Sequence, residues 1–396
     1  MSRIVAMRAV LLSAPYGDPA HSMENLLHLP SGLRTSGFVE ITLANGIRGI
    51  GEGYLAVFAP EVFRALVEQL EPLLLGMDVR RLAEIEKMLV IATGYWSLQG
   101  AARHAISAIE IALHDCNARL EDQPLWKYLG GADNPQLALY ASGGDSIGPD
   151  SMARELAAVA QLGIETFKIR ARFGHVDKVV WTQQAAPQIG IAVDMTQNLV
   201  SPSREITDVL VFANAIEARS GRAPAFLEEV FGPDQIDSLP ELRRRTDVPI
   251  AGGEIVTTEL ELIARIRNGS YDIAQPDATV IGGIQPVLSV FAAAREVSTD
   301  VYVHCWGAGV GVLANYHAAA AAGGRTAEWP LPSYPLRDRF LDRVAVVKDG
   351  HVRLSDLPGL GVELTPEIEQ EFAYQNDAVY KCLVHPSSVP AAHAWK

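Results

Sequence analysis

From residue 137 onward, short apolar runs alternate with segments that have the apolar spacing of helices. The eight runs are LALYASGGD (137–145), TFKIRAR (166–172), IAVDMT (191–196), AFLEEV (225–230), PIAGGE (249–254), DIAQPDAT (272–279), VYVHCW (301–306) and TAEWP (326–330). Alternation of this kind predicts parallel strands joined by helical crossovers. Eight repeats favour a closed barrel, which leaves no free sheet edge, over the alternative of an open doubly wound sheet.

The sequence before residue 130 lacks this regular alternation and predicts a mixed α+β unit. Strands are expected over residues 4–12, 38–44 and 47–52. The last two flank Asn45-Gly46, a strong signal for a two-residue hairpin. Helical spacing covers residues 60–75, 79–91 and 101–120. Residues 13–37, rich in Ser, Pro, Gly and His, are predicted to be a long loop, which in a compact domain is typical of a lid or binding loop.

These patterns divide the chain into three parts. We predict an α+β domain over residues 1–130, a barrel over residues 131–340, and a C-terminal segment over residues 341–396. The last segment looks irregular in sequence, and we expect it to pack back on the N-terminal part.

The composition excludes several classes of function. The chain has 33 Lys and Arg against 47 Asp and Glu, a net charge of −14, whereas a general nucleic-acid binder needs a basic face. Three cysteines are too few for a disulfide framework, which favours a reduced, cytoplasmic setting. No apolar run approaches the roughly 20 residues that span a bilayer, and Arg8 interrupts the N-terminal apolar stretch, so no signal peptide is expected. We therefore expect neither a nucleic-acid nor a membrane partner.

The second to eighth runs all carry an ionisable residue at or near their end. These residues are Lys168 with Arg170, Asp194, Glu228, Glu254, Asp277, His304 and Glu328. The 160 residues from Lys168 to Glu328 span six intervals of about 27, close to the roughly 30 residues per unit of a barrel. Charges inside parallel strands are costly unless they are paired or bind metal. Because the carboxyl ends of barrel strands meet on one face, the pattern predicts an active site there.

Three carboxylates fall on adjacent strands. Asp194, Glu228 and Glu254 have no Lys or Arg at the corresponding positions, so together they would repel and raise each other's pKa. A hard divalent cation removes that conflict, and an all-oxygen ligand set favours Mg²⁺. Salt-bridged strand ends on an ordinary barrel rim are the alternative. Glu229 adjoins Glu228, and strand alternation points only one of them inward without saying which.

The next two strands end in Asp277 and His304. An imidazole bonded to a carboxylate is held in one tautomer and made more basic, which suits a general base. Lys168 and Arg170, two residues apart, would place positive charge opposite the carboxylates, either for substrate or as an ion pair closing the acidic group. Glu328 would hydrogen-bond a developing oxyanion if burial among carboxylates kept it protonated.

Weaker signals surround this set. GAGVG (307–311) resembles a phosphate-cradling turn but lacks the G-x-G-x-x-G pattern, and close packing of a helix start is the alternative. Trp306 and Tyr54 are candidates for lining the pocket, although core packing explains them equally well. The loop around His21 and Arg34 is a candidate to close over a substrate.

These residues together resemble the enolase superfamily, and within it the mandelate racemase-like branch. The resemblance covers nearly the whole chain. Its motifs are AISAIEIALHDCNARLEDQPLWKYLGG (105–131), VDMTQN (193–198), FLEEV (226–230), AGGE (251–254), QPDATVIGG (275–283), VHCWGAGVG (303–311) and PGLGVEL (358–364). It implies an α/β fold, a modified (β/α)7β barrel of the TIM type with an α+β capping domain formed by both ends of the chain. Barrels of this type often assemble, so we expect a homo-oligomer.

The resemblance also implies roles for the site residues. Mg²⁺ would be held by Asp194, Glu228 and Glu254, which favours Glu228 over Glu229. His304 and Asp277 map onto the general-base dyad. Glu328 maps onto the electrophilic carboxyl group.

The sequence departs from the family in three places. The usual Lys-x-Lys of the second barrel strand is Lys168-Ile169-Arg170, and a guanidinium is a poor base at neutral pH. Val230 and Thr196 replace a common Pro and a common Asn, which leaves the metal assignment standing. The 34 residues between Asp194 and Glu228 exceed the neighbouring intervals and predict an enlarged helix or loop.

The substitution at Arg170 favours one-base chemistry. Our hypothesis is a Mg²⁺-dependent lyase that dehydrates an aldonate or aldarate: His304 removes the proton α to a carboxylate, and the metal stabilises the enediolate. Lys168 and Arg170 would bind the carboxylate or a hydroxyl. A racemase, epimerase or cycloisomerase using the same dyad is the first alternative. A non-catalytic protein that retains the pocket is the second.

Overall fold

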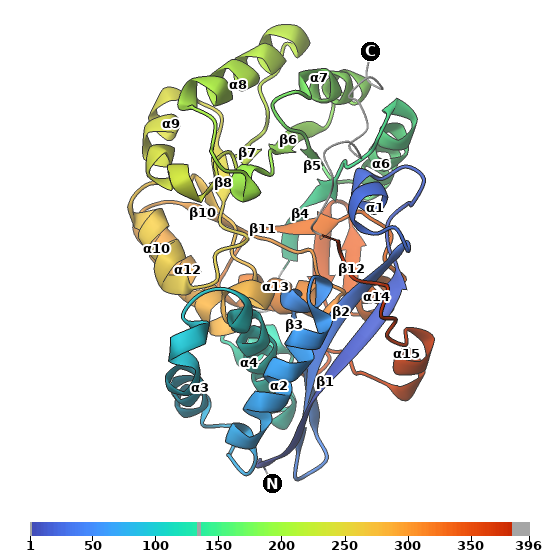
Figure 1. Cartoon of the computed structure of the whole chain (residues 1–396), viewed down its shortest axis with the longest axis vertical. Coiled ribbons are helices and arrows are strands. Elements are labelled where there is room, and N and C mark those ends of the chain that lie inside the picture. Colours follow the sequence, from blue (N-terminus) through green and yellow to red (C-terminus); the bar gives the residue numbers. More distant parts are fainter. Residues whose placement is uncertain (1, 133–135, 382–396) are drawn as a thin grey trace.

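The structure, a computed structural model, describes residues 2–132 and 136–381. It has two parts (Figure 1): a barrel, and a cap built on a three-stranded sheet at the N-terminal end of the chain. Within the described ranges, no helix combines the length and the apolar character needed to cross a bilayer.

The cap sheet is antiparallel and follows chain order. Its strands are β1 (Ile4–Pro15), β2 (Leu33–Leu43) and β3 (Arg48–Gly53). A hairpin forms at Asn45-Gly46 as predicted, but its loop has three residues, 44–46, rather than two, because the amide of Leu43 donates to the carbonyl of Ile47. Gly46 has the positive φ, +86°, that this loop requires. The helices are α2 (Pro60–Leu74), α3 (Leu82–Ser97) and α4 (Ala101–Leu120). Helix α4 packs against β3 and α2 against β1, so both cover the sheet.

Helix bounds were predicted with unequal accuracy. Helix α4 occupies the predicted residues, and α2 differs by one residue at its end. Helix α3 was predicted three residues too early, and it continues to Ser97 because Thr93 and Ser97 turn polar groups inward and hydrogen-bond each other. The apolar pattern gives no signal for such a continuation.

The prediction of one long loop over residues 13–37 is partly wrong. Strand β1 continues to Pro15 and pairs there with Leu33, where β2 begins. Between the strands, α1 (Met23–His28) begins at Ser22, whose hydroxyl caps the helix. The antiparallel register therefore extends strand structure into a segment whose Ser, Gly and Pro content suggested a loop.

Eight parallel strands close into the predicted barrel. They are β4 (Gln136–Gly143), β5 (Thr166–Arg170), β6 (Gly190–Asp194), β7 (Leu227–Glu228), β8 (Ile250–Gly252), β9 (Ile273–Ala274), β10 (Asp300–Val303) and β11 (Thr326–Pro330). Neighbours in the chain are neighbours in the sheet, and pairing of β11 with β4 closes the ring. An open sheet is thereby excluded.

Helices connect successive barrel strands. They are α6 (Pro149–Gln161), α7 (Val176–Ala185), α8 (Ile206–Ser220), α9 (Leu239–Arg245), α10 (Glu259–Arg267), α11 (Ala278–Ile281), α12 (Ile284–Glu296) and α13 (Val310–Ala321). The predicted enlargement between Asp194 and Glu228 consists of α8, which is 15 residues long, and an irregular loop before it.

The C-terminal segment is more regular than its sequence suggests. After α14 (Pro335–Leu341), strands β12 (Ala345–Lys348) and β13 (His351–Leu354) form a hairpin whose second strand pairs with β4. The chain then reaches the cap through α15 (Pro366–Glu371), where the amide of Ser13 donates to the carbonyl of Phe372 at 2.9 Å.

Buried carboxylates of the cap bind backbone amides near the barrel mouth. Glu52, at the end of β3, accepts from the amides of Ala308 and Gly311, both at 2.7 Å. A Cβ on Gly307 would lie 2.9 Å from the Glu52 carboxylate. The GAGVG segment therefore packs closely around the carboxylate of Glu52, which occupies the place that a phosphate would take.

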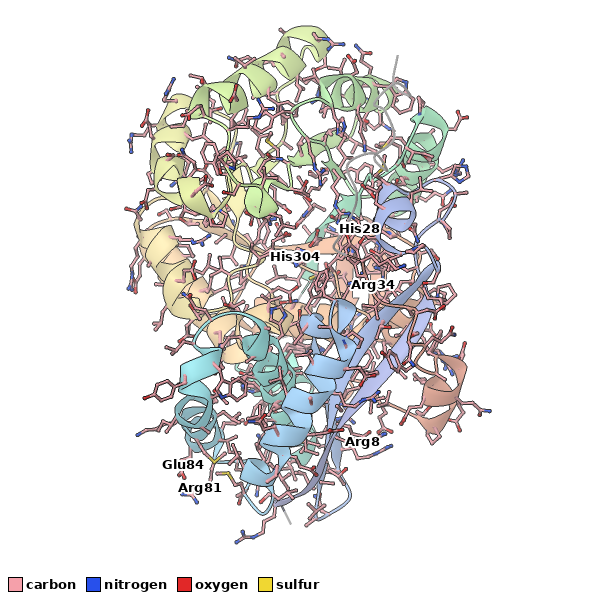
Figure 2. All side chains as sticks on the ribbon, viewed as in Figure 1. Arg8, His28, Arg34, Arg81, Glu84 and His304 are labelled. Carbon is pink, nitrogen blue, oxygen red and sulfur yellow. The ribbon has the colours of Figure 1, made fainter. Side chains whose placement is uncertain are left out.

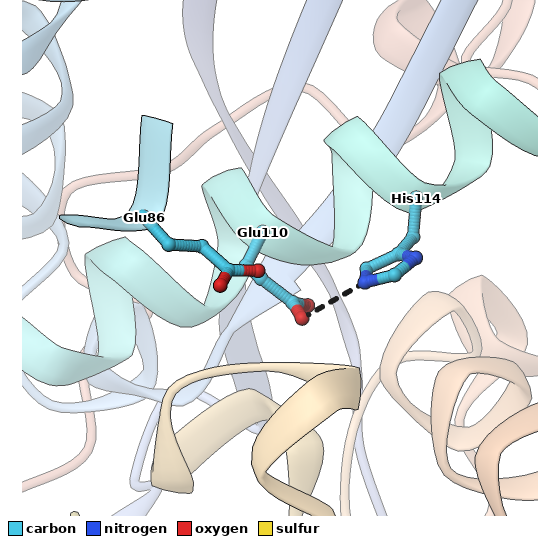
Figure 3. A group of neighbouring side chains, drawn as sticks. All are labelled: Glu86, Glu110 and His114. Carbon is cyan, nitrogen blue, oxygen red and sulfur yellow. Dashed lines mark ion pairs between the residues drawn. The ribbon is translucent and has the colours of Figure 1, made fainter. Parts of the chain in front are cut away.

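A second carboxylate repeats this arrangement on α4 (Figure 3). Glu110 accepts from the first amides of α12, Ile284 at 2.7 Å and Gln285 at 2.8 Å, and its oxygen lies 3.1 Å from Nε2 of His114. Since the first amides of a helix have no partner within it, Glu110 completes the start of α12. The cap thus fixes two segments of the barrel through hydrogen bonds to its own carboxylates.

We expect Glu52→Gln to lower the free energy of unfolding by about 1–3 kcal/mol, because the amide group presents a donor to one of two buried N–H groups. Denaturant titration measures this. Glu84→Gln is the matched control: Glu84 pairs with Arg81 on the exposed surface of α3 (Figure 2), and its loss should cost less than about 1 kcal/mol. Equal effects of the two substitutions would contradict the role assigned to Glu52.

Candidate active site

The charged residues predicted at the strand ends lie toward one end of the barrel, and three of them lie at one level. Arg170 pairs in register with Asp194, and Asp194 with Glu228. The remaining members follow in order around the mouth: Glu254 just after β8, Asp277 at the start of α11, His304 after β10 and Glu328 within β11. Parallel strands in register therefore bring these residues to the carboxyl-terminal face, where barrel enzymes place their sites.

Lys168 lies between two buried carboxylates. Its Nζ donates to Glu228 and lies 2.9 Å from an oxygen of Glu328, so it joins β5 to strands on both sides of the mouth. Burial by itself would lower the pKa of Lys168, but the two carboxylates outweigh it and hold the pKa well above its usual value. The residue carries a fixed positive charge.

Glu228 and Glu229 have different surroundings. Glu228 contacts Lys168 and accepts from the side-chain amide of Gln275. Glu229 has a positive φ of +48° and accepts from the backbone amide of Gly253 at 2.7 Å. Glu228 thus contacts the cation of β5 and Glu229 a backbone amide, while both have other carboxylates of the mouth as charged neighbours.

Asp194, Glu228 and Glu254 supply the ligand set of the metal prediction. Burial raises the pKa of Asp194, and the nearby charge of Glu254 raises it further. Burial is also the main cause that raises the pKa of Glu228 to about 8. Crowded, desolvated carboxylates of this kind fit a hard dication by their chemistry.

The oxygens of these three carboxylates do not meet as one tight group. Asn198 donates to Glu254 at 3.0 Å, and the other Glu254 oxygen lies 3.2 Å from Nε2 of His304. Within the described ranges, the acidic and histidine side chains whose ligand atoms all lie within 4.8 Å of one another are Glu86, Glu110 and His114. The ligand assignment at the barrel mouth therefore stays a prediction from strand position and charge.

His304 and Asp277 form a hydrogen-bonded pair. Nδ1 of His304 lies 2.8 Å from Oδ2 of Asp277. The other carboxylate oxygen accepts from Thr279 at 2.8 Å and from Asn315 at 2.9 Å, which fixes the orientation of the carboxylate. Since an ionised carboxylate only accepts, Nδ1 carries a proton and Nε2 is left to face a substrate.

The protonation of His304 depends on the charges around it. Burial would lower its pKa, but the charges of Glu328 and Glu254 and the bond to Asp277 raise the pKa to about 10. The neighbouring carboxylates therefore favour the doubly protonated imidazole.

The surroundings of Glu328 disfavour the protonated form that burial among carboxylates would favour. Burial would raise its pKa, but the positive charges of Lys168 and His304 outweigh burial and hold it below the usual value. The backbone amide of Cys305 also donates to Glu328 at 2.6 Å. Glu328 is therefore an ionised acceptor, because two cations rather than other carboxylates are its nearest charged neighbours.

Arg170 is paired rather than free. Its Nη1 lies 3.2 Å from an oxygen of Glu24 on α1, and its Nε lies 3.7 Å from Asp194. The guanidinium also lies 5.3 Å from the ring centre of Trp306. Arg170 thus links the segment between β1 and β2 to the barrel. It lies on the same side of the mouth as Asp194, the first candidate metal ligand.

That segment is docked on the end of β4. The amide of Met23 donates to the carbonyl of Asp145 at 3.0 Å, and the amide of Ile147 donates to the carbonyl of His21 at 3.1 Å. The imidazole of His21 is 46% exposed and lies 2.8 Å from Asp18 of the same segment. The described structure gives His21 no contact with the strand-end residues, so its predicted contact with substrate stays a prediction.

The other three candidates for substrate contact come together. Arg34 is buried, and its Nη2 donates to the carbonyl of Trp306 at 2.9 Å. Its guanidinium carbon lies 5.4 Å from the ring centre of Tyr54. Figure 2 shows Arg34 near His304 between the cap and the barrel, which agrees with the contact to Trp306, two residues further along the chain.

Sequence reasoning missed several residues at this site. Gln275 contacts Glu228, and its position two residues before Asp277 would have placed both on one face of an extended segment. Glu24, Asn198 and Tyr16 carry no such signal. They reach the site only because the cap and the loop after β6 fold over the barrel mouth.

Comparisons with known proteins give the family. Residues 151–368 match the family described as "Enolase C-terminal domain-like". Residues 32–130 match the family described as "Mandelate racemase / muconate lactonizing enzyme, N-terminal domain". The match over residues 32–130 ends where the cap ends, and the match over residues 151–368 begins after the first barrel strand, β4.

Individual relatives share about a quarter of their residues with the chain. Arabinonate dehydratase of Saccharolobus solfataricus is 26% identical over 342 residues, which cover 84% of this chain and 89% of the relative. The crystal structure of 3,6-anhydro-D-galactonate cycloisomerase from Zobellia galactanivorans has a TM-score of 0.80 at 23% identity, covering 94% of this chain and 99% of that one.

A further solved structure shares the fold. L-talarate/galactarate dehydratase from Salmonella typhimurium LT2, liganded with Mg and L-lyxarohydroxamate, has a TM-score of 0.78 at 22% identity and covers 93% of this chain and 92% of its own. At this level of identity the likeness establishes the architecture. With the family matches over both the cap and the barrel, it shows that the chain belongs to the mandelate racemase/muconate lactonizing enzyme family of the enolase superfamily.

Proposed function

We propose that this protein dehydrates an acid sugar by removing the proton α to a carboxylate. The observation that carries the proposal is the single base at the barrel mouth: His304 is held by Asp277, while Arg170 stands where a second lysine base would be and is paired with Glu24. The names of the relatives, which include a dehydratase of an acid sugar, support the substrate class.

The first step is a proton transfer to Nε2 of His304. The C–H bond α to the carboxylate breaks, its electron pair enters the enediolate, and the proton goes to the imidazole. Asp277 stabilises the imidazolium that forms, because its carboxylate already accepts from Nδ1.

The second step expels the β-hydroxyl group. The enediolate electrons form a carbon–carbon double bond, the C–O bond breaks, and the imidazolium returns its proton so that the group leaves as water. The enol then tautomerises to a 2-keto-3-deoxy acid. Lys168, whose positive charge is fixed, stabilises negative charge on the substrate during both steps.

Asp194, Glu228 and Glu254 are the residues that would hold Mg²⁺. When bound, the ion would polarise the substrate carboxylate, make the α-proton more acidic, and offset the carboxylate charge that raises the pKa of His304. The burial and the raised pKa values of Asp194 and Glu228 support this assignment. Because the three carboxylates lie apart at neighbouring strand ends, metal binding is tested by experiment.

An isomerase is the second candidate, and a cycloisomerase among the structural relatives favours it. A cycloisomerase or epimerase could begin with the same proton transfer to His304. The two candidates differ in the fate of the enediolate: it either loses a hydroxyl group or takes a proton back on carbon.

Turnover of a panel of aldonates and aldarates in D₂O with Mg²⁺ distinguishes these reactions. We expect a 2-keto-3-deoxy acid for at least one compound, detected as its semicarbazone, and no turnover with EDTA. NMR of the remaining substrate should show no deuterium at the α-carbon. Deuterated starting material without dehydration would contradict the dehydratase and support an epimerase.

His304→Asn should lower kcat by about 10²–10⁴-fold, because the variant lacks the base that removes the α-proton. Steady-state kinetics on the accepted substrate measure the change, and circular dichroism checks the fold. His351→Asn is the control, since His351 is exposed in β13. A His304 variant with normal turnover would rule out the one-base mechanism.

A further inference from the structure

Arg34 differs from Lys168 and Arg170 because it forms no ion pair with the described residues. Its side chain is 1% exposed, and only Nη2 is hydrogen-bonded, to the carbonyl of Trp306. Nε and Nη1 are buried without a hydrogen-bond partner in the described structure, and no described carboxylate lies within 4 Å of the guanidinium. Burying unmade hydrogen bonds of a charged group is costly, so such a group commonly serves a ligand.

The immediate surroundings of Arg34 are aromatic. Its guanidinium carbon lies 4.7 Å from the ring centre of Tyr16, 5.4 Å from that of Tyr54 and 5.6 Å from that of Tyr334. Aromatic faces stabilise the positive charge, but they do not replace hydrogen-bond acceptors in the plane of the guanidinium. These tyrosines hold the charge in place and leave its N–H groups unused.

Two further donors next to Arg34 are also unpartnered. The hydroxyl of Tyr16 and the indole N–H of Trp306 are buried with no hydrogen-bond partner among the described residues. Tyr16 contacts the guanidinium through its ring, and Trp306 accepts from it through its carbonyl. Arg34 and two residues in contact with it therefore each hold a buried donor group without a partner among the described residues.

The two basic residues within strand β5 are already engaged. Lys168 contacts Glu228 and Glu328, and Arg170 contacts Glu24 and Asp194. Glu24 in the docked segment between β1 and β2 pairs with Arg170 rather than with Arg34. Arg34 is buried without an ion pair among the described residues, so it can receive a second negative charge on a substrate.

We infer that Arg34, Tyr16 and Trp306 bind a second carboxylate of the substrate, so that the preferred substrate is a dicarboxylic acid sugar, an aldarate, rather than an aldonate. A carboxylate is charged and has about four acceptor sites, so it can accept from one side of the guanidinium and from a neighbouring neutral donor together, whereas the terminal hydroxyl of an aldonate has two acceptor sites and no charge. The inference rests on the proposed function and specifies its substrate.

Matched pairs of acids test this preference. Galactarate and galactonate, like glucarate and gluconate, differ at the end of the chain where the first has a carboxylate and the second a hydroxymethyl group. We expect the full-length protein with Mg²⁺ to bind at least one diacid at least about 10-fold more tightly than its matched monoacid in calorimetry. kcat/KM for turnover should show the same preference.

Arg34→Gln should remove most of this preference by weakening diacid binding, with a smaller effect on the monoacid. Arg8→Gln is the matched control, because Arg8 lies on the cap sheet and pairs with Glu40 and Glu369 (Figure 2). If Arg34→Gln does not fold, Tyr16→Phe and Trp306→Phe carry the test: each removes one donor and keeps an aromatic ring, and each should reduce the preference several-fold.

Equal binding of diacids and monoacids, or an equal loss of both in the variants, would overturn the inference even if dehydration occurs. Selective, Arg34-dependent binding of a diacid without any 2-keto-3-deoxy product would support the inference and overturn the proposed reaction. The two failures are therefore distinguishable.

Discussion

Negative charge buried at the mouth of the barrel is the constraint on which the other features of this site depend. Strands in register bring several carboxylates to one level, and burial alone would force some of them to take up protons. Lys168 offsets part of this negative charge by pairing with Glu228 and Glu328 from strands on either side. The positive charges of His304 and Arg170 offset a further part. The same arrangement holds Glu328 ionised and makes His304 strongly basic.

The cap extends this pattern of charge. Its own buried carboxylates bind backbone amides of the barrel: Glu52 fixes the start of α13 and Glu110 the start of α12. The ion pair of Arg170 with Glu24 joins the segment between β1 and β2 to a barrel strand. Residues far apart in sequence therefore become one site through hydrogen bonds and ion pairs between cap and barrel, and Arg34 reaches the segment after β10 through its hydrogen bond to the carbonyl of Trp306.

Most of the architecture followed from periodicity. The eight apolar runs, the Asn45-Gly46 hairpin and the α4 helix were predictable because each is determined by local pattern. Residues 13–37 were not, because their helix and strand ends depend on pairing with distant residues such as the end of β4. The hairpin of β12 and β13 was missed for the same reason.

The site shows the same division. Its strand-end residues were predictable from position, because parallel strands bring equivalent positions together. Their partners were not: Glu24 and Tyr16 come from the cap, and the charge state of Glu328 depends on Lys168 and His304 rather than on the number of carboxylates nearby. Which charged residues from different helices and strands pair with one another depends on the folded structure, so the sequence pattern does not predict these pairs.

The most direct measurement of the central claim is Mg²⁺ binding by calorimetry in buffers of different ionisation enthalpy. The account predicts one site per chain, lost in Asp194→Asn, Glu228→Gln and Glu254→Gln. It also predicts proton release on binding at neutral pH, because the pKa of Glu228 is raised to about 8 without the metal. Binding that survives these substitutions but is lost in Glu110→Gln or His114→Asn would contradict it.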